Sequence, residues 1–122
     1  PENDGLGLAL DFVEPIEVLE PTGNVSISEE IVLKWAPYPG ASAYAIQIFE
    51  SESAHQLPWN NGLFKWRERP RVSTPFFDLK AGGVKLKSGF YYMVDAKAED
   101  EAGRIISETA ISLQQKHFKI VD

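Results

Sequence analysis

Hydrophobic and polar positions alternate with a period of two residues in several short segments of this chain. The clearest segment runs from Tyr92 to Ala98, where even-numbered positions hold aromatic, branched or small residues and polar residues such as Asp95 and Lys97 lie between them. This period is typical of a strand that buries one face. We therefore predict a strand here, with its even-numbered side chains in the core.

The same alternation predicts further short strands, separated by turns rich in glycine, proline and asparagine. Proline residues restrict the first strand and the one near residue 70 to sheet edges, and Thr22 to Asn24 is expected to be a turn. No segment shows the period of an amphipathic helix. The expected strands cover residues 16–20, 31–35, 44–49, 64–72, 74–79 and 92–98, followed by a last segment beyond Ile105. About seven strands at this spacing predict an all-β fold, an antiparallel two-sheet β-sandwich.

The last segment changes its parity. Ile111 and Leu113 share one parity, whereas Phe118 and Ile120 have the other. A regular strand cannot bury both pairs, because a slip of one residue turns side chains to the opposite face. We therefore predict a β-bulge or a break within residues 114–117.

Composition sets limits on the class of protein. The 122 residues are enough for one domain with its own core, and 43% hydrophobic with 25% charged residues are globular values. The absence of cysteine excludes disulfides and thiolate metal sites. No run approaches the roughly 18 apolar residues of a membrane helix, so we expect no membrane insertion by this chain. The net charge of −6 argues against binding to nucleic acid.

Aromatic and basic side chains gather between residues 55 and 72. Residues 64–122 carry eleven basic against eight acidic residues, and every second residue from Lys65 to Arg71 is basic. Aromatic rings beside planar cations are typical of protein interfaces and of sugar-binding platforms. The candidate interaction surface consists of Trp59, Phe64, Trp66, Arg67, Arg69 and Arg71.

An alternative interpretation of this stretch is structural. Trp59 and Trp66 then cover an edge of the sandwich, and the basic side chains are only solvated. Exposed tryptophans favour binding, and buried tryptophans favour the covering role.

No pattern in the chain predicts catalysis or cofactor binding. His55 and His117 lie in polar surroundings, without a nucleophile motif or metal-ligand spacing. The acidic run at residues 99–101 offers oxygens to Ca²⁺, but three consecutive side chains rarely converge on one ion, so a solvated turn is favoured. We expect no enzymatic activity, no cofactor and no metal.

Several short elements follow one another in a characteristic order from about Pro15 to Val121. They are Ile16 with Pro21 to Gly23, Leu33 to Pro37, Pro39 to Ala41 with Tyr44 to Ile48, Leu86 and Gly89 with Tyr92 to Ala96, Asp100 to Gly103, and Phe118 to Ile120. Their order and spacing resemble a fibronectin type III domain, in the form found in bacterial modular proteins. The stretch between Phe49 and Phe76 is longer than that family usually has, and the Arg-Gly-Asp motif is absent.

The resemblance implies an immunoglobulin-like strand topology for residues 14–122. Residues 1–13 are then an N-terminal extension, either a linker or an extra edge strand. In the family, a tryptophan packs between the sheets and a tyrosine corner ties two strands together, and these positions correspond to Trp35 and Tyr92. The expected structural core comprises Trp35, Tyr44, Leu86, Tyr92 and Val94.

The resemblance also implies a function without catalysis. A module of this kind acts as a spacer or a protein-interaction domain, with a protein partner or neighbouring domains of the same polypeptide. The location implied is extracellular, periplasmic or in the cell envelope. The alternative is a carbohydrate-binding accessory module that uses the aromatic residues of the 55–72 stretch to bind glycan.

Overall fold

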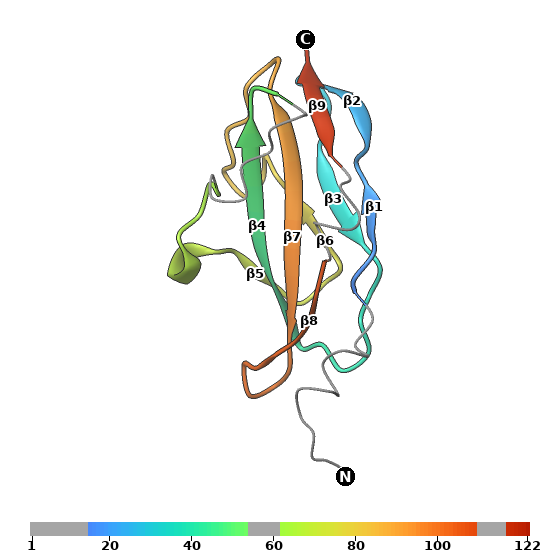
Figure 1. Cartoon of the computed structure of the whole chain (residues 1–122), viewed down its shortest axis with the longest axis vertical. Coiled ribbons are helices and arrows are strands. Elements are labelled where there is room, and N and C mark those ends of the chain that lie inside the picture. The colour runs from blue at the N-terminus through green and yellow to red at the C-terminus, as the bar shows by residue number, and fades with distance from the viewer. Residues whose placement is uncertain (1–14, 54–61, 110–116) are drawn as a thin grey trace.

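Two β-sheets and one turn of 3₁₀ helix make up the part of the chain that a computed structural model describes, residues 15–53, 62–109 and 117–122 (Figure 1). None of these residues forms a helix long and apolar enough to cross a membrane. The elements are β1 (Val18–Glu20), β2 (Gly23–Ser26), β3 (Val32–Trp35), β4 (Ala43–Ser51), η1 (Trp66–Glu68), β5 (Arg71–Val72), β6 (Phe76–Asp78), β7 (Tyr91–Glu99), β8 (Ile105–Glu108) and β9 (Phe118–Val121). The all-β prediction is therefore confirmed.

The two sheets differ in size and in strand direction. The smaller sheet has the order β1-β3-β6 and is antiparallel. The larger has the order β2-β9-β7-β4-β5, and β8 pairs with the part of the β7 edge that β9 leaves open. Because β2 runs parallel to β9, the prediction of a purely antiparallel sandwich is wrong.

The parallel pair arises where the chain passes from one sheet to the other. After β1 the backbone crosses to the larger sheet without reversing, so it runs alongside the last strand in the same direction. Gly23, the first residue of β2, has φ +73°, a conformation that a residue with a Cβ rarely adopts. The turn predicted at Thr22 to Asn24 is thus replaced by the start of a strand.

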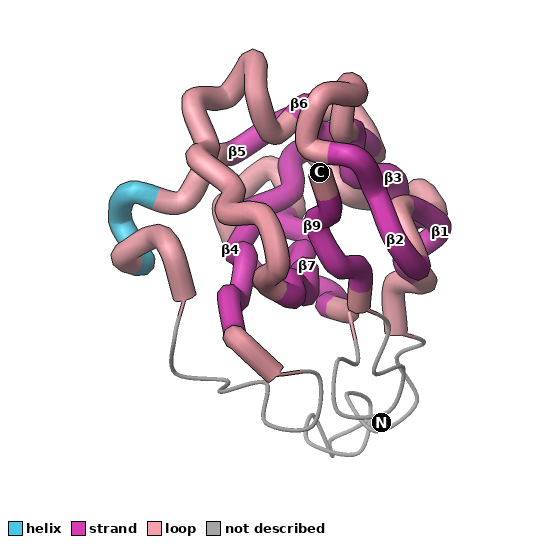
Figure 2. The backbone as a smooth tube through the Cα atoms, turned by 90° about the horizontal axis from the view of Figure 1, so that it is seen from above, coloured by secondary structure: helices cyan, strands magenta, loops and turns pink. Residues whose placement is uncertain are grey.

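The hydrophobic core lies between the sheets. The end-on view in Figure 2 shows β1 and β3 on the side of the molecule away from β4. Trp35 of β3 meets Tyr44 of β4 edge to face, with 5.3 Å between ring centroids. Tyr92 stacks on Phe118 at 5.7 Å. Of the five residues expected in the core, Trp35, Tyr44, Tyr92 and Val94 are buried, and Leu86 packs partly buried against them.

The two central strands, β4 and β7, are buried on both faces. They pair regularly over nine residues, from Ala43 opposite Glu99 to Ser51 opposite Tyr91. The even-numbered residues of β7 face the core as predicted, but Met93 and Asp95 on the opposite face are also buried. The prediction that this strand buries one face is therefore incomplete, because further polypeptide covers the outer face of the sheet.

The last segment does not form one regular ladder with β7. Glu108 lies opposite Lys97, and Phe118 lies opposite Tyr92. Ten residues of the last segment thus span five residues of β7, which leaves an excess of five. The predicted bulge position, residues 114–117, lies outside the described residues except for His117. Phe118 and Ile120 are buried.

The hydroxyl of Tyr92 is hydrogen bonded at the end of the core where β7 begins. It accepts the backbone N–H of Lys87 at 2.7 Å and donates to Oε2 of Glu50 at 2.8 Å. Lys87 Nζ lies 3.5 Å from the other Glu50 oxygen. Burial raises the pKa of Tyr92 well above its usual range, and the neighbouring Glu50 carboxylate raises it further.

Replacing Trp35 by alanine is expected to lower the free energy of unfolding by about 3–5 kcal/mol, because a buried indole leaves a cavity that the sheets cannot fill. Trp35→Phe should cost less, because the phenyl ring leaves a smaller cavity, and both substitutions remove a buried indole N–H that has no acceptor. Urea denaturation followed by circular dichroism measures both changes. A Trp35→Ala variant as stable as the parent contradicts this placement.

Replacing Tyr92 by phenylalanine is expected to cost about 1–3 kcal/mol, because the Lys87 N–H and the buried Glu50 carboxylate each lose a partner. Tyr44→Phe is the matched control. The Tyr44 hydroxyl accepts one backbone N–H, that of Tyr38, at 2.8 Å, so its loss should cost less.

The Tyr92 contribution should also depend on pH. The unfolded chain releases this proton near its ordinary pKa of about 10, whereas the folded protein retains it. The stabilisation is therefore complete below about pH 10 and is lost as the pH rises toward the folded value, by up to about 1.4 kcal/mol per pH unit. The stability difference between the parent and Tyr92→Phe should shrink across this range. A difference independent of pH would count against the proposed linkage.

Candidate interaction site

The stretch from Gly62 to Val72, which we call the strap, runs along the edge of β4 opposite β7. At one end Gly62 pairs with Phe49, and at the other β5 pairs with Tyr44 and Ala45. On the strap, Pro70 is eight positions after Gly62. On β4, Phe49 is only three positions after Ile46, whose N–H donates to the Pro70 carbonyl. The five additional residues form an outward loop that contains η1, seen at the left of Figure 1.

The side chain of Gln47 fastens the beginning of this loop. Its Oε1 accepts the backbone N–H of Phe64 at 3.0 Å, and its Nε2 donates to the Phe64 carbonyl at 2.6 Å. A Cβ on Gly62 would come within 2.5 Å of the Gln47 amide nitrogen. Glycine at position 62 therefore leaves room for the Gln47 amide. This amide makes the two hydrogen bonds to Phe64 that the backbone of a neighbouring strand would otherwise make.

Arg69 fastens the other side of the loop across the outer face of the sheet. Its Nη2 lies 3.2 Å from Oδ2 of Asp95 on β7, and the two side chains are only 7% and 5% exposed. Asp95 also lies 3.3 Å from Lys97 Nζ and accepts the hydroxyl hydrogen of Thr109 at 2.9 Å. Three partners thus compensate one buried carboxylate, which would otherwise be costly to remove from water.

Arg71 repeats this arrangement two residues later, closer to solvent. Its Nε lies 3.3 Å from Oε1 of Glu99, with the arginine side chain 38% exposed. Lys97 forms a further pair with Glu108 on β8. The outer face of β7 therefore carries two carboxylates, Asp95 and Glu99, with Lys97 between them. The carboxylates are paired with arginines of the strap, and Asp95 is also paired with Lys97.

Trp66 lies over the two arginines and remains accessible. The guanidinium carbon of Arg69 is 4.9 Å from the ring centroid, and that of Arg71 is 5.5 Å from it, both within cation–π range. Trp66 is nevertheless exposed to solvent, with 48% of the residue accessible. Two ion pairs with β7 thus hold an exposed aromatic residue in a defined position.

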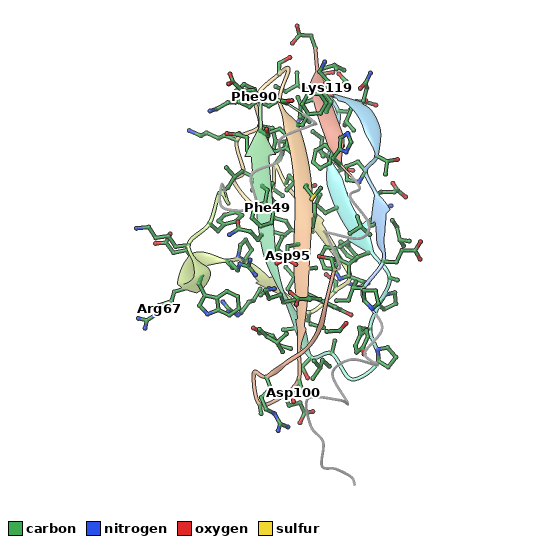
Figure 3. The ribbon with its side chains drawn as sticks, in the orientation of Figure 1. Phe49, Arg67, Phe90, Asp95, Asp100 and Lys119 are labelled. Carbon is green, nitrogen blue, oxygen red and sulfur yellow. The ribbon has the colours of Figure 1, made fainter. Side chains whose placement is uncertain are left out.

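The strap corrects the prediction of one strand from Phe64 to Val72. Only Arg71 and Val72 are paired as a strand, and the 3₁₀ turn interrupts the alternation. As a result, Arg67 extends away from the sheet, whereas Asp95 lies on β7 within it (Figure 3). Pro70 lies beside the short edge strand, as its missing N–H requires.

The structure brings five of the six predicted surface residues into the strap but gives them different roles. Phe64 packs partly buried against the core, Arg69 and Arg71 form ion pairs, and Trp66 and Arg67 are exposed. Trp59 lies outside the described residues, and so does His55. Trp66 is exposed, as the binding interpretation expects, and the part of that test that concerns Trp59 stays a prediction.

Residues that sequence reasoning missed hold the strap in place. Gln47, Asp95 and Glu99 appear in the sequence as the polar positions of two strands, which usually face solvent. One available signal was Gly62 of the Asn61-Gly62 pair. A glycine has no Cβ, so it can indicate a position where another group lies close to the backbone, as the Gln47 side chain does here. The partners of Arg69 and Arg71 lie 26 and 28 residues away, so local spacing does not reveal them.

The acidic turn after β7 is satisfied by its own neighbours. Asp100 accepts the backbone N–H groups of Ala102 and Arg104, each at 2.9 Å, and pairs with the Arg104 guanidinium at 3.0 Å. The backbone N–H of Arg104 is the main cause that lowers the pKa of Asp100. Within the described ranges no three histidine or acidic side chains gather as a metal site would require.

Comparisons with family models, with curated proteins and with solved structures found no match to this chain.

Replacing Asp95 by asparagine is expected to lower the free energy of unfolding by about 3–5 kcal/mol, because Arg69 then stays buried without its counter-charge. Glu20→Gln is the control, since the Glu20–Lys34 pair is exposed and its oxygen and nitrogen are 4.0 Å apart. Its loss should cost less than about 1 kcal/mol. Urea denaturation measures both, and equal costs for the two variants would contradict the role of Arg69.

Proposed function

We propose that this chain is a fibronectin type III-like module with a binding role rather than a catalytic one. It serves as a protein-interaction domain or spacer of a secreted or cell-envelope protein. Three observations support the family assignment: the two-sheet architecture, the burial of Trp35 between the sheets, and the Tyr92 hydroxyl that accepts the backbone N–H of Lys87. The last of these is the contact that a tyrosine corner makes.

The observation that carries the binding role is the position of Trp66. An exposed, mobile tryptophan loses much conformational freedom when it binds, whereas Trp66 already rests on two arginines that are themselves paired with β7. Tryptophan and arginine are the residues most enriched among those that dominate binding energy at protein interfaces. The strap thus offers a rigid aromatic anchor on an edge of the sandwich.

A carbohydrate-binding role is the second candidate, and the same exposed ring supports it. Sugar rings stack on accessible indole faces, and Trp66 is 48% accessible. Protein binding is favoured because the neighbouring exposed side chains are charged and long, and because Trp66 is the only aromatic residue of the described strap that is exposed.

The test compares Trp66→Ala with a matched control, Phe76→Ala. Phe76 is an aromatic residue of similar exposure, 50%, on the smaller sheet. Proteins of the source organism that the immobilised module retains are identified, purified and measured for affinity. We expect at least one protein that binds the parent and Phe76→Ala equally and Trp66→Ala at least about tenfold more weakly.

Two results would decide against the interaction role. The first is a set of retained proteins whose purified affinities are the same for Trp66→Ala and for the parent. The second is Trp66-dependent binding on a glycan array without a protein partner, which would favour the carbohydrate-binding module. Thermal melting of each variant shows that both remain folded.

A further inference from the structure

The internal ion pairs leave an excess of positive charge at the tip of the strap. Arg69 and Arg71 are neutralised by Asp95 and Glu99. Lys65 and Arg67 are exposed, and neither forms an ion pair with any described residue. The only acidic residue of the strap is Glu68, which is also exposed. The basic alternation seen in the sequence thus reduces to two available cations that flank Trp66.

The same tip presents apolar surface. Trp66 is 48% exposed there, whereas Leu63, 37% exposed, lies where the strap begins, with its N–H donating to Ile48 of β4. The indole N–H of Trp66 has no acceptor among the described residues, and the side chains of Lys65 and Arg67 are donors without acceptor capacity. Donors therefore outnumber acceptors on this surface. A complementary partner must offer more hydrogen-bond acceptors than donors.

We propose that the partner of the strap is an acidic protein segment, in which aspartate or glutamate residues lie beside an aliphatic or aromatic side chain. The apolar side chain packs on Trp66, and the carboxylates accept hydrogen bonds from Lys65, Arg67 and the indole N–H. This inference rests on the proposed binding function and specifies the chemistry of its partner.

The overall charge of the chain bears on this choice. A net charge of −6 repels an acidic partner at long range, but at physiological salt charges are screened beyond about 8 Å. The cations of the strap therefore determine the field at contact, whereas the remaining surface disfavours acidic segments elsewhere. Nucleic acid is the competing polyanion, and two cations on a short loop provide too few phosphate contacts to hold it.

The experiment selects a random twelve-residue peptide library on the immobilised parent protein, after depletion on Trp66→Ala. Recovered peptides are synthesised, and their affinities are measured for the parent, for Arg67→Glu and for Lys85→Glu. Lys85 is the matched control, an exposed lysine outside the strap without an ion pair among the described residues. A single-stranded DNA oligonucleotide is measured in parallel.

We expect the recovered peptides to be rich in aspartate and glutamate next to leucine, phenylalanine or tryptophan. Their affinity should fall at least about tenfold in Arg67→Glu, change less than about twofold in Lys85→Glu, and weaken in 0.5 M salt because the contacts are exposed. DNA should not bind.

Three outcomes overturn the proposal. Strap-dependent peptides that are neutral or basic contradict the acidic partner and leave the proposed function standing. DNA binding that depends on Trp66 replaces the protein partner with nucleic acid. The absence of any strap-dependent peptide also rejects the acidic partner, and the capture of whole proteins described above then decides the proposed function separately.

Discussion

The regular pairing of β4 with β7 is the constraint on which the rest of this structure depends. Nine consecutive residue pairs hold the two strands together, and both faces of the pair are buried. The inner face provides aromatic and aliphatic side chains to the core, and its polar groups, the Tyr92 hydroxyl and the Glu50 carboxylate, satisfy each other and Lys87 at one end. The outer face carries Gln47, Asp95 and Glu99, whose polar groups must find partners once water is excluded. Each of the three finds a partner on the strap, although Asp95 also pairs with Lys97 and Thr109. These contacts explain why an exposed edge segment is attached by side chains rather than by a continuous ladder.

Both neighbours of this central pair contain the same excess of chain. The strap has five more residues than the β4 edge that it follows, and the last segment has five more than the β7 edge between Tyr92 and Lys97. A regular pair cannot absorb an excess, because each additional residue would shift every later side chain to the opposite face. The additional residues of the strap must therefore leave the sheet. In the strap they form the outward loop that carries Trp66.

Sequence patterns predicted the inner faces of the sandwich well and the outer face poorly, for a physical reason. Alternation identifies a buried face when the other face is polar, as in the strand that contains Trp35. On β7 the polar residues are themselves buried, so the pattern is the same while the environment differs. The alternating cations from Lys65 to Arg71 were misleading in the same way, because spacing alone does not show that Arg69 pairs with a carboxylate 26 residues away. The parallel direction of β2 depends on a crossing between sheets, which short-range patterns do not encode.

The ion pairs of Arg69 and Arg71 explain how the strap combines rigidity with exposure. A loop at a sheet edge that is fastened by apolar burial has to turn its large side chains inward, which removes them from a partner. This strap is fastened instead by two guanidinium groups that extend over β4 to reach β7, and their planar surfaces also support the indole ring. Trp66 can therefore stay half exposed while its ring rests on two guanidinium groups that are paired with β7. The cost is that two of the four cations are consumed internally, so the charge available to a partner is set by Lys65 and Arg67 and not by the basic run as a whole.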